Sequence, residues 1–272
     1  MSATEGERWT SAELERLSAA RFRPRAIGRF LLASQRRASR VRRRRPDVAR
    51  REAAWAAAGA AAWLGLAAIG VEPFRRRTAA GLGGWVATVV MLDWHLGMLE
   101  TPAGQPRNLG AADATTLLRA WLVPAVADDP TALLCLAGFA SDALDGRLAR
   151  ATEPTRLGRD LEGLVDTAFA VAILRGARRR NALGVAATAA ETARLAAGFA
   201  YAVSSYFAHA RAPDARVLRA ARAIAPLRAA GVVIAVSGRR RLGEPVLVAG
   251  SLASVAVVAR ELACATPLCQ RS

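Results

Sequence analysis

The grouping of apolar residues into long blocks constrains this chain more than any other feature of its sequence. The blocks are roughly 18 to 22 residues long, about the length an α-helix needs to cross the hydrocarbon core of a bilayer. The clearest block runs from Ala53 to Val71 and contains no charged residue. Strand-like alternation of apolar and polar residues is absent, so the pattern predicts helices throughout.

We expect eight membrane-spanning helices in the 272 residues. They cover residues 53–71, 79–98, 111–127, 131–148, 157–174, 182–210, 224–237 and 244–265. Abundant Ala and Gly suit close contact between helices in lipid. The expected fold class is all-α, a polytopic membrane helical bundle. A six-helix core (111–272) follows two additional transmembrane helices (53–110).

Residues 1–52 form a basic segment, with 15 Arg against six acidic residues. The whole chain carries a formal charge of +17, and all 39 of its basic residues are Arg. Thr10 and Glu13 have the spacing of a capping box, which predicts that a helix begins there. The sequence leaves two readings of the segment open, a solvated tail and a helix lying on anionic lipid headgroups. Nothing in it resembles a nucleic-acid recognition motif, so no nucleic-acid partner is expected. The basic excess places the N-terminus on the cytosolic side of the membrane.

The cysteines and histidines exclude other classes of protein. Cys135, Cys264 and Cys269 are too few and too scattered for a disulfide framework. With only two histidines in the chain, a Cys/His metal site is excluded as well.

Acidic residues inside the apolar blocks are the candidate functional residues, because ionisable groups are costly in a membrane. Asp142 and Asp145 are three residues apart, and Glu162 and Asp166 are four apart, so each pair shares one helix face. The two helices are consecutive, and a hairpin would bring the four carboxylates together. Four carboxylates at one point need a cation, and oxygen ligands alone indicate Mg²⁺ or Mn²⁺. The neighbouring Arg150 indicates a phosphate-bearing substrate.

These helices carry a longer motif. The chain reads Asp142-Ala-Leu-Asp145-Gly146-Arg-Leu-Ala149-Arg150, and then Gly158-Arg-Asp-Leu-Glu162-Gly-Leu-Val-Asp166. This order resembles the signature of the CDP-alcohol phosphatidyltransferase family, D-x2-D-G-x2-A-R, about eight residues, then G-x3-D-x3-D. Upstream, Thr116-Leu-Leu-Arg119 with Pro124 resembles the family's first-helix pattern, T-x2-R followed by Pro. The resemblance covers roughly Ala111 to Ala265.

The chain departs from the family's pattern in three places. Glu162 stands where the family has Asp, and Asp113 stands where it usually has Asn. The linker between Arg150 and Gly158 has seven residues where eight are usual.

The resemblance implies a role for each matching residue. Asp142, Asp145 and Glu162 would ligate a pair of divalent ions, and Asp166 would ligate one of them and act as the base. The CDP moiety would be held by Asp113, Thr116, Gly146, Ala149, Arg150, Thr155 and Gly158. The donor would be CDP-diacylglycerol or a similar CDP-alcohol, and an acceptor alcohol would take its phosphatidyl group with release of CMP. The enzyme would be a multi-pass protein of the cell membrane, in contact with membrane lipids, with its site facing the cytoplasm. A membrane dimer is common in that family.

Two other functions remain open. An intramembrane prenyltransferase with two Asp-rich helices would use the same acids to hold a prenyl diphosphate through Mg²⁺. A catalytically inactive membrane homologue or a transporter would use them for ion passage. The acceptor alcohol is not determined by the sequence.

Two further groups of polar residues lie inside the apolar blocks. Asp93 and His95 are read either as an interfacial cap or as a substrate contact. Glu191 and Arg194 are three residues apart, and are read either as a neutralising pair or as an acceptor-binding Arg194 beside its counter-ion.

Overall fold

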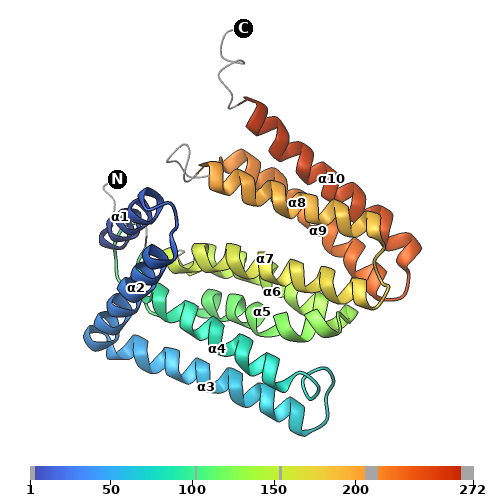
Figure 1. Cartoon of the computed structure of the whole chain (residues 1–272). Helices are drawn as coiled ribbons and strands as arrows, with labels where there is room; N and C mark the ends of the chain where they lie inside the picture. The colour runs from blue at the N-terminus through green and yellow to red at the C-terminus, as the bar shows by residue number, and fades with distance from the viewer. Residues whose placement is uncertain (1–3, 102, 153–154, 206–213, 265–272) are drawn as a thin grey trace. The chain divides into compact units, whose positions relative to one another are not determined.

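A computed structural model describes residues 4–101, 103–152, 155–205 and 214–264. Over these ranges the chain has ten α-helices, one short 3₁₀ helix and no β-strand, which confirms the prediction of an all-helical chain (Figure 1). The helices are α1 (Glu5–Ala19), α2 (Pro24–Arg44), α3 (Pro46–Ala68), α4 (Thr78–His95), η1 (Leu96–Met98), α5 (Ala111–Asp128), α6 (Ala132–Thr152), α7 (Arg156–Arg179), α8 (Val185–Val203), α9 (Ala215–Val236) and α10 (Arg240–Cys264).

Each of the eight expected spans coincides with one helix, from α3 to α10. The largest difference is at α9, which begins at Ala215 and not near residue 224. By length and composition, one helix of the described ranges, α10 over residues 240–260, is long and apolar enough to cross a membrane. A single such helix also occurs in the cores of soluble proteins, so the polytopic arrangement stays a prediction.

The described residues form two compact units. Unit 1 comprises the described residues of Met1–Ala125 and Ala140–Phe169, and unit 2 comprises those of Val126–Phe139 and Ala170–Ser272. The helices α5, α6 and α7 therefore contribute residues to both units. In unit 2, α9 ends in a turn at Gly238, whose φ of 86° is readily adopted only by glycine.

The chain's first helix begins earlier than expected. Thr4 caps α1: its hydroxyl accepts from the backbone N–H of Glu7, and the Glu7 carboxylate accepts from the N–H of Thr4. The prediction of a capping box at Thr10 and Glu13 was wrong, because both residues lie inside α1. Two capping-box patterns of similar form lie six residues apart, Thr4 with Glu7 and Thr10 with Glu13, and the first one starts the helix.

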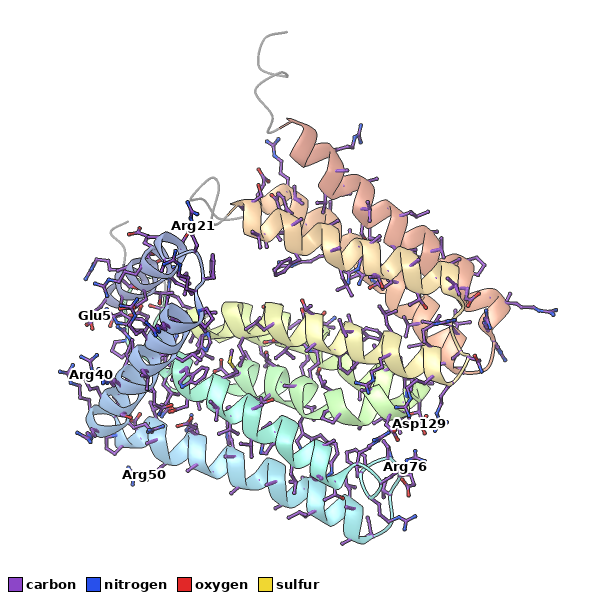
Figure 2. The ribbon with its side chains drawn as sticks, in the orientation of Figure 1. Glu5, Arg21, Arg40, Arg50, Arg76 and Asp129 are labelled. Carbon is purple, nitrogen blue, oxygen red and sulfur yellow. The ribbon has the colours of Figure 1, made fainter. Side chains whose placement is uncertain are left out.

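Within its described residues, the basic segment is helical and packs against other parts of unit 1. α2 starts with proline at its first position, which suits a helix start. One side of α2 buries Ala26, Ser34 and Ala38, and the helix crosses the end of α4 (Figure 1). Exposed arginines such as Arg40 lie on the other side (Figure 2). The segment is therefore a docked, amphipathic part of the fold with a charged outer surface.

Reciprocal contacts between tryptophan and glycine hold α3 against α4. Trp63 of α3 lies against Gly81 of α4, and Trp85 of α4 lies against Gly59 of α3. Each indole N–H is also bonded to a backbone carbonyl, Trp63 to Phe74 at 3.2 Å and Trp85 to that of residue 56 at 2.8 Å. Because both rings are buried and fixed by hydrogen bonds, they have little freedom to move aside.

Two glycines of α4 provide a matched test of this packing. A Cβ added at Gly81 would overlap the Trp63 ring, so Gly81→Ala should destabilise the protein by about 1–3 kcal/mol. Gly83 has open space around it, so Gly83→Ala should stabilise α4 by about 0.5–1 kcal/mol through helix propensity alone. Thermal unfolding of the two purified variants measures both effects. Equal unfolding temperatures would contradict the proposed role of the Gly81–Trp63 contact.

Candidate functional site

Three acidic side chains of unit 1 converge. Asp142 of α6 and Glu162 and Asp166 of α7 each offer a carboxylate oxygen, and these oxygens all lie within 4.8 Å of one another. The side chains of Asp142 and Asp166 are 46% and 43% exposed, so an ion from solution can reach them. The expected meeting of the two helix faces is therefore present for three of the four acids.

Asp145, the fourth acid, lies beside this group and is buried. Its Oδ2 atom accepts a 2.6 Å hydrogen bond from the Thr116 hydroxyl. Thr116 is itself 1% exposed, so the pair is shielded from solvent. Asp145 was predicted as a ligand like the other three acids, but it is not one of the three carboxylates that converge.

Arg119 joins the acids to one another. Its guanidinium is almost completely buried, and one of its terminal nitrogens contacts Asp142 Oδ1 at 3.0 Å and also Asp166 Oδ1. The other terminal nitrogen lies 3.4 Å from Asp145 Oδ2. The sequence identified Arg119 only as part of the first-helix motif and gave it no partner. Its spacing of three residues from Thr116 was the available signal, since it places both side chains on one face of α5.

Three of the predicted nucleotide-binding residues lie together at the starts of α5 and α7. Asp113 is buried and accepts from the backbone N–H of Gly110 at 2.7 Å. The Thr155 hydroxyl accepts from the N–H of Gly158 at 3.1 Å. A Cβ on Gly158 would lie 3.6 Å from Asp113 Oδ1, so the two helix starts are neighbours. Both side-chain bonds cap a helix start, and this structural role alone explains why Asp and Thr occupy positions 113 and 155.

The remaining predicted nucleotide-binding residues lie in α6. Gly146 is half-buried and directly follows Asp145. Ala149 and Arg150 continue the same helix, but their side chains lie outside the described part of the structure. The expected contact between Arg150 and a phosphate therefore stays a prediction.

The basic N-terminal helices reach the edge of this site. Glu7 of α1 forms an ion pair with Arg156, the first residue of α7. The backbone N–H of Arg156 also donates to the carbonyl of Glu100 at 3.3 Å. Arg51 donates to the carbonyl of Leu109 at 2.7 Å, just before α5 begins. The basic segment is thus bonded next to the start of α5, where Asp113 lies, and to the start of α7, which Thr155 caps.

A second polar cluster connects α2, α3 and α4. Asp93 accepts from Arg42 and, at 3.2 Å, from the amide of Gln35. Glu52 of α3 is buried near Asp93 and Arg42, and burial, reinforced by the charge of Asp93 and opposed by Arg42, raises the pKa of Glu52 to about 7. His95 contacts the carbonyl of residue 91 at 2.7 Å through Nδ1. Asp93 thus serves to attach the basic helix α2.

A third cluster lies inside unit 2. Glu191 and Arg194 form the pair that their spacing predicts, at 2.8 Å. Arg228 of α9 adds a second ion pair to Glu191 at 3.1 Å, and Ser251 of α10 donates to it at 2.7 Å. The sequence did not indicate Arg228 or Ser251, because their spacing from Glu191 along the chain carries no periodic signal. This carboxylate connects three helices.

Comparisons of the chain with protein-family models, curated proteins and solved structures found no match.

The raised pKa of Glu52 predicts a pH dependence of stability. Between its ordinary pKa of 4.5 and about 7, the folded protein holds a proton that the unfolded chain has lost, so stability falls as pH rises through this window. Glu52→Gln removes that cost and should stabilise the protein at pH 8 by about 2 kcal/mol, with a flatter profile from pH 5 to 7.

Thermal unfolding at a series of pH values measures this effect. Glu72→Gln changes a more exposed carboxylate and is the matched control. A profile for Glu52→Gln that parallels that of the unchanged protein would show that Glu52 does not titrate in this range.

Proposed function

We propose that the chain is a membrane CDP-alcohol phosphotransferase. It moves a phosphatidyl or related group from a CDP-alcohol such as CDP-diacylglycerol to an acceptor hydroxyl, with release of CMP. The observation that carries the proposal is the convergence of Asp142, Glu162 and Asp166, three acids that stand at motif positions of that family. Like charges repel, so acidic side chains that face one point need positive charge beside them.

The donor atoms fit Mg²⁺ or Mn²⁺. Three carboxylates meet without a cysteine or histidine among them, and hard divalent cations prefer such oxygen ligands. We propose that Asp142, Glu162 and Asp166 hold the ions, with Asp145 as a further ligand once it turns from Thr116. Bound ions would neutralise the diphosphate of the donor and the charge that develops on the leaving CMP.

The chain's own residues supply the rest of the reaction. Asp166 takes the proton of the acceptor hydroxyl, whose oxygen attacks the phosphorus atom of the phosphatidyl group. The bond between that phosphorus and the oxygen of CMP breaks, and CMP leaves with the bonding electrons. Asp113, Thr155 and Gly158 lie together at two helix starts, where the positive end of each helix dipole suits an anionic nucleotide.

The setting proposed for this reaction is the cell membrane. Helices α3 to α10 correspond to the eight apolar blocks, and in the proposed topology each of these blocks spans the bilayer. The basic segment, with its exposed arginines, faces the cytoplasm and so do the acids. Two copies of the chain are proposed to associate in the membrane.

Metal dependence gives the first test. Purified protein with CDP-diacylglycerol and a panel of alcohols should release CMP only with Mg²⁺ or Mn²⁺, and Asp142→Asn should abolish nearly all release while the protein still inserts in the membrane. The loss follows because Asn cannot supply the charge that holds a divalent ion.

Asp129→Asn is the control, since Asp129 is paired with Arg180 outside the acidic group. Full CMP release in excess chelator would refute the metal site. If the protein releases diphosphate from a prenyl diphosphate and releases no CMP from CDP-diacylglycerol, the result would support the prenyltransferase function instead. Wild-type release by Asp142→Asn would show that Asp142 is not a metal ligand. No release of CMP or of diphosphate by the unchanged protein would favour a non-catalytic membrane protein.

Glu162 gives a sharper test, because it departs from the family's pattern. Its side chain is longer than that of Asp by one carbon, an added reach of about 1.3 Å. If the linker, one residue shorter than usual, sets a helix register that suits this arm, Glu162→Asp should lose activity although it restores the family's residue. Glu162→Gln should lose more, because it also removes a charge from the metal ligands.

Adding one residue to the linker of the Glu162→Asp variant should recover part of the loss, since both changes act on one geometry. Rates of CMP release measure all three variants. If Glu162→Gln is as active as the unchanged protein, Glu162 is not a ligand.

A further inference from the structure

Arg119 occupies the place where a cation would act on the acidic group. Its guanidinium is 2% exposed and contacts three carboxylates at once, those of Asp142, Asp145 and Asp166. Two of these, Asp142 and Asp166, belong to the group that could hold a metal ion. The arginine therefore binds two of the carboxylates that a divalent ion would need.

The hydrogen bonds of Arg119 indicate that charge, and not a complete bonding network, holds it there. Its Nε atom is buried and has no hydrogen-bond partner among the described residues. A buried arginine with a purely structural role normally satisfies its donors. The terminal nitrogens face only carboxylates in the bonds observed, so the guanidinium offsets the mutual repulsion of the acids.

We propose that Arg119 is the site's internal counter-ion: it holds Asp142 and Asp166 when no divalent ion is bound, and it releases them when an ion binds. This inference rests on the proposed function, because it concerns the same metal site. Arg119 is a positioning residue that acts through the acids. It keeps the ligands together in the metal-free protein and makes divalent ions compete with a fixed positive charge.

Direct measurement of metal binding tests the competition without any turnover. Mn²⁺ binding to the purified full-length protein is measured by calorimetry and by electron paramagnetic resonance, for the unchanged chain and for Arg119→Gln. Removing a unit positive charge next to a divalent ion should tighten Mn²⁺ binding by roughly tenfold or more. The metal-free variant should unfold at a lower temperature than the unchanged protein, and Mn²⁺ should raise its unfolding temperature by more.

Two comparisons separate charge from general damage. Arg228→Gln removes another partly buried arginine that is paired with a carboxylate, but in unit 2, and should leave Mn²⁺ affinity unchanged. The single variant Arg119→Gln leaves the buried carboxylate of Asp145 without its cation, which could prevent folding. In that case the double variant Arg119→Gln/Asp145→Asn removes this buried charge as well. That double variant is then compared with Asp145→Asn, and the same gain in affinity is expected.

The outcomes distinguish the two proposals. If the unchanged protein binds Mn²⁺ and loss of Arg119 leaves the affinity equal or weaker, the counter-ion role is wrong and the metal site stands. If the unchanged protein binds no Mn²⁺, the metal site and the counter-ion role both fail. If Arg119→Gln binds Mn²⁺ more tightly than the unchanged protein and Arg228→Gln binds it equally well, the inference is supported.

Discussion

The ion cluster of Arg119 with Asp142, Asp145 and Asp166 is the interaction on which the site depends. Carboxylates on two neighbouring helices repel one another, and without a cation the ends of α6 and α7 that carry them would be driven apart. Arg119 supplies that cation from a third helix, α5. Three helices of unit 1 are thereby tied at one point, and the acids stay close enough together to act as ligands.

Bonds around the cluster fix the helices that carry it. Thr116 lies one turn before Arg119 in α5, and its hydroxyl donates a hydrogen bond to Asp145. Asp113 caps the start of α5, and Thr155 caps the start of α7. Such caps satisfy N–H groups that a helix start otherwise leaves without a partner. Local bonds of this kind set where each helix begins, and through helical spacing they set where its acids point. Positions in the motif that look purely chemical thus also have structural roles.

The basic N-terminal segment takes part in the same unit. Arg42 binds Asp93, Arg51 binds the backbone before α5, and Glu7 binds Arg156 at the start of α7. Reading residues 1–52 as a separate tail rested on their charge, which differs sharply from that of the following apolar blocks. A charged helix can still bury a narrow face of small residues, as α2 does with Ala26 and Ala38. The mean composition of the segment does not reveal such a face, because the charged residues of the other faces dominate it.

Local regularities in the sequence determined most of the helices. The long apolar blocks predicted α3 to α10, and the spacing of three and four residues placed the acids on shared faces, because helix period is a property of neighbouring residues. Only the tertiary structure decided that Asp142, Glu162 and Asp166 converge while Asp145 turns to Thr116. It also placed Arg119 among the acids and Arg228 beside Glu191. These pairings join residues far apart along the chain, and no local pattern records which helix faces which.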